Sequence, residues 1–328
     1  MHAAELHSTH AGIHPAASRD GAAGRERALA ATLSRLALRS LHGELVLYPK
    51  PGLVSLIDNG SHDDMTAATF VRSLFSLRHY FSGISLAGMR AAPFSELKQL
   101  GIHAEQRMLR ATGGINTHRG AIFSLGMLAA AVAYCHKRNI FASPTSVRAV
   151  LLQQWGRDLA LHTGALPAQT HPSYLSVQSH GLQVAAKHAA GGAREEAATG
   201  FPSVFDVALP RLRAALDAGR SWEEAQVDAL FALIAHISDT NLYHRGGAEG
   251  AVLAKTSAQA FLDAGASANP GWRHMAMQAH RLFVRHRLSP GGAADLLAAA
   301  CMLHHCTEMH AGSGSLVQPM PPEQACRA

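Results

Sequence analysis

The sequence predicts an all-α fold: a single globular domain of roughly ten to twelve helices at ordinary helix lengths. Hydrophobic residues make up 48% of the 328 residues and aromatic residues only 6%. Alanine and leucine dominate instead, and these residues favour helices over strands. No run alternates Val, Ile, Thr or Tyr with polar residues, as a half-buried strand would.

Helical spacing of apolar residues recurs between residues 25 and 310. A first helix is expected to end before Pro49 and Pro51, because proline cannot continue a helix. Another helix is expected over 95–110, and Ser221 with Glu224 forms a capping box before a further apolar helix. The other apolar stripes are Leu29, Leu33, Leu36, Leu41 and Leu45, then Phe70, Leu74, Leu77 and Phe81, then Val147, Val150, Leu151 and Trp155.

The two ends of the chain differ from this pattern. Residues 1–24 are small, polar and rich in histidine, and residues 311–328 have the composition of a linker, so we expect a disordered N-terminal tail and a flexible C-terminal tail. No linker-like stretch interrupts 25–310, which favours one domain. The start of the chain lacks the basic and apolar regions of a signal peptide, and the four cysteines form no CxxC pair. The apolar run 121–135 is short for a bilayer. We therefore expect a cytoplasmic protein with no membrane partner.

The formal net charge is +6 and the sequence pI is near 9.4. Lysine and arginine are scattered singly rather than in a block, so the chain is not expected to bind nucleic acid. A small polyphosphate ligand fits this charge better.

The first polar cluster spans 50–55 and 59–65. Lys50 follows a helix end, where a point charge can meet a phosphate. His62, Asp63 and Asp64 precede a helix expected near Thr66. Asp63 by itself is best explained as compensation of the helix dipole, whereas His62 and Asp64 are candidate site residues.

The second cluster, 111–121, places a Gly-Gly turn before the start of an apolar helix. Free N–H groups and the positive dipole end at such a start attract anions, and Arg119 adds a permanent charge. Asn116, Thr117, His118 and Arg119 are the candidates here. An ordinary Thr117 cap with solvated neighbours is the alternative.

Three further clusters carry polar side chains. Arg194 and Glu196 can bind a ligand or form an exposed helix-end pair. Asp239 and Asn241 offer hard oxygens suited to Mg²⁺, with Arg245 as a second phosphate contact. The remaining candidates are Ser289 and Asp295, equally explained as helix-start residues, and Glu105, which lies near the apolar stripe of its helix.

Seven segments, in this order, resemble the triphosphoribosyl-dephospho-CoA synthase family. They are KPGLV (50–54), NGSHDDM (59–65), ATGGINTHRGAIFSLG (111–126), SHG (179–181), GGAREEAATGFP (191–202), DTNLYHRGG (239–247) and SPGGAADLLA (289–298). The resemblance implies that 25–310 is a catalytic domain transferring the triphosphoribosyl group of ATP to the 2′-hydroxyl of 3′-dephospho-CoA, with release of adenine. Departures from the family pattern are Ser55 in place of Asp, Arg119 in place of Lys, and Glu195 in place of Gly.

The implied reaction is an inverting displacement through an oxocarbenium-like state, which needs an acid for the leaving group and a base for the hydroxyl. Glu105 or Asp64 is the expected base and His118 a possible proton donor to adenine, in a site that includes Asp239. Mg²⁺ is expected on Asp64, Asp239 and Asn241. The residues expected to hold the triphosphate are Lys50, Arg119, Arg194 and Arg245, with His62, Asn116, Thr117 and Glu196 beside them.

Two other functions fit the same residues. The His62-Asp63 pair on an all-α fold is found in HD-type metal-dependent phosphohydrolases, which need further ligands around two metals. A non-catalytic nucleotide- or CoA-binding partner of a decarboxylase complex is the second. The family supplies the prosthetic group of malonate decarboxylase or citrate lyase carriers, and the malonate pathway is favoured here. A downstream carrier-protein transferase and a homodimer are possible partners.

Overall fold

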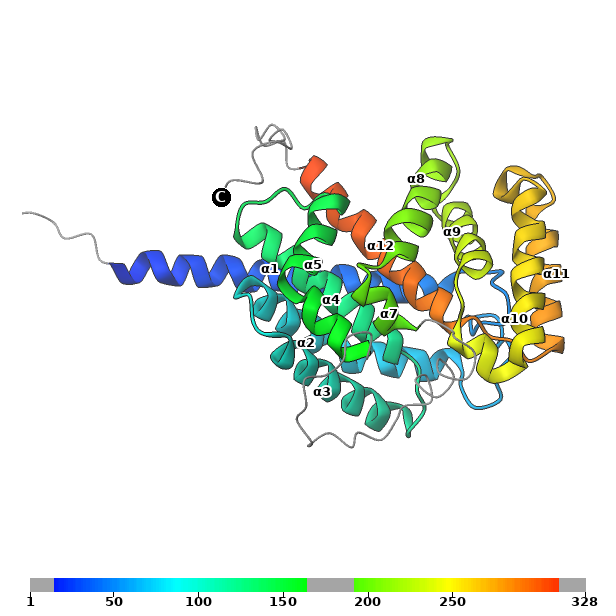
Figure 1. Cartoon of the computed structure of the whole chain (residues 1–328), viewed down its shortest axis with the longest axis horizontal. Helices are drawn as coiled ribbons and strands as arrows, with labels where there is room; N and C mark the ends of the chain where they lie inside the picture. Colours follow the sequence, from blue (N-terminus) through cyan, green and yellow to red (C-terminus); the bar gives the residue numbers. More distant parts are fainter. Residues whose placement is uncertain (1–14, 164–191, 313–328) are drawn as a thin grey trace, which may run out of the picture.

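The structure, a computed structural model, describes residues 15–163 and 192–312, and all of its regular elements within these ranges are helical. This confirms the predicted all-α fold, and the eleven α-helices in the described ranges agree with the expected number. The elements, shown in Figure 1, are α1 (Pro15–Val46), α2 (Ala67–Met89), α3 (Phe94–Thr112), α4 (Arg119–Lys137), α5 (Pro144–Thr163), α7 (Ala193–Ala198), the π-helix η1 (Ser203–Ala208), α8 (Leu209–Asp217), α9 (Trp222–His236), α10 (Thr240–Asp263), the 3-10 helix η2 (Ala266–Ala268), α11 (Trp272–Arg285) and α12 (Gly291–Gly312).

Helix α1 begins at Pro15, so the predicted disorder of residues 1–24 is wrong for its last ten positions. The segment is rich in alanine, and once the helix has formed at Ala30, where the chain enters the core, each added residue gains a hydrogen bond at little cost. In Figure 1 these first turns project beyond the other helices. Residues 1–14 and 313–328 lie outside the described part of the chain.

Helix α4 is the centre of the core and packs against α2, α12, α5, α1 and α3. Its small residues allow close approach: a side chain on Gly88 of α2 would overlap the backbone of Ala130. Among the described helices α4 is the one long and apolar enough to cross a membrane, but 72% of that span is buried inside the fold. Its apolar character is that of a core helix.

The predicted helix starts are largely confirmed. Ser221 and Glu224 form the expected capping box at α9: the Glu224 N–H donates to Ser221 Oγ at 3.3 Å, and the Ser221 N–H donates to Glu224 Oε2 at 2.8 Å. Thr66 precedes α2 as expected. The alternative in which Thr117 caps α4 is wrong, because His118 occupies the N-cap position and makes no side-chain cap.

The loop joining α1 to α2 is fixed by two glycines. Gly52 and Gly60 have positive φ, and their backbones lie so close that a side chain on Gly60 would overlap Gly52. Ser61 then donates to the carbonyl of Leu288 at 2.6 Å. This contact holds residues 59–65 against the start of α12, although more than 200 positions separate them.

Candidate active site

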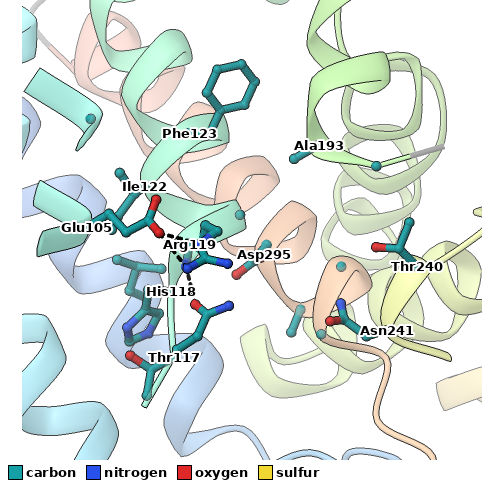
Figure 2. A pocket seen from close by; sticks show the side chains of 18 of the residues that line it. Glu105, Thr117, His118, Arg119, Ile122, Phe123, Ala193, Thr240, Asn241 and Asp295 are labelled. Atoms are coloured by element: carbon teal, nitrogen blue, oxygen red, sulfur yellow. Dashed lines mark hydrogen bonds and ion pairs between the residues drawn. The ribbon is translucent and has the colours of Figure 1, made fainter. Parts of the chain in front are cut away.

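A cavity of about 910 Å³ lies between helices α1–α4 and the segments α7, α10 and α12 (Figure 2). Each of the polar clusters singled out in the sequence contributes to its wall. The predicted site residues that line it are His62, Asp64, Glu105, Asn116, Thr117, His118, Arg119, Arg194, Asn241 and Arg245. Clusters that lie far apart along the chain therefore converge on one space.

Arg119, the first residue of α4, is ion-paired with Glu105 of α3 (Figure 2). Its Nε and a terminal nitrogen donate to Glu105 Oε1 at 2.6 and 2.5 Å, and both side chains stay partly exposed, at 42% and 31%. Arg194 of α7 lies near this pair; burial lowers the pKa of its guanidinium, and the carboxylates of Glu195 and Glu105 oppose that shift. Both arginines keep their charge at neutral pH, so this wall presents two cations.

Arg245 and His62 line another part of the wall. Arg245 donates to His62 Nδ1 at 2.8 Å, and His62 Nε2 lies 2.8 Å from Ser289 Oγ. Because Nδ1 accepts from a guanidinium, the neutral ring carries its hydrogen on Nε2 and donates it to Ser289. Burial and the Arg245 charge lower the pKa of His62 to about 4. A neutral His62 therefore orients Arg245, while Asp64, 61% exposed, lies 3.6 Å from the ring.

His118 is buried at the cavity wall and ends a chain of hydroxyl groups. Thr117 donates to Ser73 Oγ at 2.7 Å, and Ser73 Oγ lies 2.6 Å from His118 Nδ1. Since Thr117 supplies the hydrogen of the first bond, the Ser73 hydroxyl can donate to Nδ1, which places the ring hydrogen on Nε2. Nε2 has no hydrogen-bond partner among the described residues. Burial and the charge of Lys50 lower the pKa of His118 to about 3, so the ring is neutral.

Glu44 and Asp295 also line the cavity, although neither was assigned a role in the reaction that the resemblance implies. Glu44 lies on α1, and Asp295 lies in the second turn of α12. Asp295 carried a signal, since it is a carboxylate within an otherwise apolar helix start, but the same pattern fits dipole compensation. Glu44 carried none, because a lone glutamate on a helix is ordinarily exposed.

Lys50 was expected to bind phosphate, and the structure corrects this. Its side chain is completely buried behind the cavity wall, where Nζ donates to Glu44 Oε1 at 2.7 Å and to the Glu44 carbonyl at 2.6 Å. Burial lowers the pKa of Lys50 and the Glu44 carboxylate opposes that shift. Glu44, which does line the cavity, is the residue whose charge Lys50 compensates.

Asp239 was expected to act in catalysis and to bind metal, and this also needs correction. Its carboxylate is buried behind the cavity and caps two helices at once, accepting from Asn241 N at 2.8 Å in α10 and from Ala293 N at 3.1 Å in α12. Asn241 turns its amide nitrogen to Asp239 at 3.0 Å. With these bonds made, Asp239 has no oxygen to offer a metal in the cavity.

The expected Mg²⁺ ligands thus do not form a set. Asp239 is engaged in capping, Asn241 points its donor to it, and Asp64 lies with His62 on the loop before α2. In residues 15–163 and 192–312, no group of three or more His, Cys, Asp or Glu side chains is arranged to hold a metal. A metal at this site would need most of its ligands from a bound polyphosphate.

The prediction for the cluster at 191–202 is corrected in part. Glu196 accepts from Ser203 Oγ at 2.5 Å and from Ser203 N at 3.2 Å, so it fixes the start of η1 and does not line the cavity. Glu195 lines it instead and accepts from Gly192 N at 2.8 Å. At another departure from the family pattern, Ser55 Oγ accepts from Asp58 N at 3.2 Å and stabilises a turn. The segment 179–181 lies outside the described residues.

One wall of the cavity is apolar. Phe94, Leu97 and Ile102 of α3 face Ile122 and Phe123 of α4. Phe94 also meets the ring of His162 at 5.6 Å between centroids, and burial together with nearby cations lowers the pKa of that histidine to about 4. The cavity therefore combines a cationic wall with an apolar one, which suits a ligand with both phosphates and an organic moiety.

Comparison with known proteins agrees with this chemistry. The family model described as ATP:dephospho-CoA triphosphoribosyl transferase matches residues 30–313. The match begins at Ala30, where α1 enters the core.

Curated relatives are similar over most of their length. The chain is 38% identical over 271 residues to a probable 2-(5''-triphosphoribosyl)-3'-dephosphocoenzyme-A synthase of Acinetobacter calcoaceticus, covering 83% of this chain and 89% of the relative. A Pseudomonas putida protein of the same name is 38% identical over 280 residues, covering 84% and 94%. A 2-(5''-triphosphoribosyl)-3'-dephosphocoenzyme-A synthase of Pectobacterium atrosepticum is 36% identical over 291 residues, covering 86% and 91%. No solved structure matches the chain.

Proposed function

The chain belongs to the ATP:dephospho-CoA triphosphoribosyl transferase family, and we propose that its cavity is where the triphosphoribosyl group of ATP passes to dephospho-CoA. The observation that carries this proposal is the convergence of Arg119, Arg194 and Arg245, from three distant segments, on one cavity. Phosphate binding needs such fixed cations, and guanidinium groups match phosphate geometry.

The two substrates bring a triphosphate and a diphosphate into the site. The three arginines, with Lys98 at the rim of the same cavity, supply positive charge against them. We propose that Mg²⁺ enters with the triphosphate, with Asp64 as the nearby carboxylate. Bound there, Mg²⁺ would neutralise part of the phosphate charge. The apolar wall at Phe94, Leu97 and Ile102 suits an adenine ring or the pantetheine arm.

The reaction breaks the bond between ribose and adenine and forms a bond from the same carbon to the 2′-hydroxyl of the acceptor. Glu105 is the base that we propose for this hydroxyl. Its carboxylate faces the cavity, and the ion pair with Arg119 fixes its position beside a phosphate-binding cation. Orienting the base and the acceptor in this way is a large part of what such a site contributes.

Neither alternative function is favoured by a specific contact. His62 is bonded to Arg245 and Ser289, and Asp63 does not line the cavity, so the pair does not have the arrangement of a two-metal phosphohydrolase within the described residues. The ion-paired Glu105 beside a cationic wall supports chemistry over simple binding.

The proposal is tested by incubating the protein with ATP, Mg²⁺ and dephospho-CoA. Adenine release is measured, and the mass of the product is determined by mass spectrometry. Arg119→Met should lower kcat/KM for ATP by about 10- to 100-fold, since charged hydrogen bonds contribute ~1.5–3 kcal/mol. Arg90→Met, which removes an exposed arginine paired with Glu96, is the matched control and should leave turnover unchanged.

Other outcomes identify the alternatives. Release of phosphate or pyrophosphate without adenine would indicate a phosphohydrolase, and binding of both substrates without turnover would indicate a non-catalytic partner. If the Arg119 and Arg90 variants were equally active, the cavity would not be the site of the reaction.

A further inference from the structure

Asp295 occupies the middle of the cavity wall. It projects from α12 and lies between Arg119 and Asn241 in the view of Figure 2. Its carboxyl group is so close to the start of α4 that a side chain on Gly120 would overlap it, and it accepts a hydrogen bond from the Ala121 N–H. Asp295 is thus held at one place while remaining partly accessible from the cavity.

The charges around Asp295 are mostly negative. Glu44 faces it from α1 and Asp239 from the loop before α10, and no cation lies within ion-pairing distance of it in the described ranges. Lys50 is held by Glu44 and Arg119 by Glu105. Burial, Glu44 and Asp239 raise the pKa of Asp295 well above its ordinary value, against the single opposing hydrogen bond from Ala121. Because the described residues beside it include other carboxylates and no cation, Asp295 is the carboxyl group of the cavity whose surroundings most favour its protonated form.

The other candidate acids are less suitable. His118 has a pKa of about 3 and is already neutral, so it has no readily lost proton. Glu105 accepts from Arg119, and Asp64 is largely exposed to solvent. Pairs of carboxyl groups in contrasting environments commonly divide the acid and base roles of one reaction, and Asp295 and Glu105 are such a pair.

We propose that Asp295 is the general acid that protonates adenine as the glycosidic bond of ATP breaks; this rests on the proposed function. The ribose–N9 bond breaks with its electron pair going to adenine, and the Asp295 proton passes to a ring nitrogen of the departing base. The acceptor hydroxyl forms the new bond at the same carbon and loses its proton to Glu105. One proton enters the leaving group and one leaves the acceptor, so the step balances, and solvent returns both carboxyl groups to their starting states.

Asp295→Asn tests the proposal with two donors, ATP and N7-methyl-ATP. The methylated adenine departs as a neutral molecule without being protonated. With ATP the variant should lose about 100- to 10,000-fold in kcat, the usual contribution of general acid catalysis. With N7-methyl-ATP it should retain turnover within a few-fold of the wild-type protein.

Two further variants separate catalysis from structure. Gly120→Ala displaces the Asp295 carboxyl group without removing it. This variant should also lose more turnover with ATP than with N7-methyl-ATP, but by a smaller factor than Asp295→Asn. Asp228→Asn removes a buried carboxylate that bonds Ser267 and pairs with Arg211 and does not line the cavity. It should leave the ratio of turnover with ATP to turnover with N7-methyl-ATP unchanged, even where stability falls.

Infrared spectroscopy gives a readout that needs no substrate. The wild-type protein at pH 7 should show a protonated carboxyl C=O band that Asp295→Asn lacks. Absence of that band, or an equal loss of activity with both donors, would overturn the assignment. Failure of the wild-type protein to release adenine from ATP would instead refute the proposed function and leave the infrared band as the evidence on Asp295.

Discussion

Replacing Asp239 by alanine should destabilise the protein by about 2–4 kcal/mol. The carboxylate caps α10 through Asn241 N and α12 through Ala293 N. Loss of one cap costs ~1 kcal/mol, and a buried N–H left without a partner costs ~1–3 kcal/mol. Losing both caps therefore costs several kcal/mol. The substitution also removes the cost of keeping a carboxylate away from water, and this gain offsets part of the loss. For a chain of 328 residues the change corresponds to a fall in melting temperature of roughly 1.5 °C per kcal/mol.

The assay is thermal unfolding followed by far-UV circular dichroism, with kcat measured at least 10 °C or so below the lower melting temperature. Asp239→Asn should fall between the wild-type protein and Asp239→Ala, because one oxygen acceptor remains. Asp263→Ala, which removes an exposed carboxylate at the end of α10, is the control and should leave both measurements unchanged.

A catalytic or metal-binding Asp239 would behave differently. Asp239→Asn would then abolish turnover while the melting temperature stayed within about a degree of the wild-type value. That result would refute the capping argument and return Asp239 to the active site.

Two further predictions concern buried ionisable groups. Lys50→Met should lower the free energy of unfolding by ~3–5 kcal/mol, because it leaves Glu44 without its buried partner. Urea unfolding measures this change. Unchanged stability with a raised KM for ATP would show instead that Lys50 binds phosphate. The free energy of unfolding should also fall as the pH drops from about 6.5 toward 3, since the pKa of His118 is lowered to about 3 and the unfolded chain takes up the proton first, at up to ~1.4 kcal/mol per pH unit. The stability is fully present above the pKa of histidine in the unfolded chain and is lost as the pH falls toward the pKa of His118 in the folded protein. If His118→Gln showed the same slope of unfolding free energy against pH between about pH 6.5 and 4 as the wild-type protein, the lowered pKa of His118 would be contradicted.

The helices were predictable because their signals are local. The capping box at Ser221 and the prolines after Val46 act within a few residues, and they set the boundaries that the structure confirms. The helical first turns of α1 were missed because composition alone does not distinguish a polar tail from an extension of a packed helix.

The convergence of the polar clusters was also predictable, since binding and catalytic residues gather on the loops and helix ends that a rigid scaffold positions. Arg119 and Arg245 meet this expectation and line the cavity. The pattern does not say which residue of a cluster faces the space, because neighbouring side chains on a turn point in different directions.

The sequence by itself determined the all-α architecture, the positions of the helix starts and the cationic chemistry of the segments that meet at the cavity. Only the tertiary structure decided which charged groups face that cavity. Lys50 and Asp239 carry the same charges as Arg245 and Asp64, yet they lie behind the wall because Glu44 in one case and the N–H groups of α12 in the other become their partners. A buried charge must be paired inside the protein, and its partner is set by how distant helices pack, so no local pattern of residues contains that information.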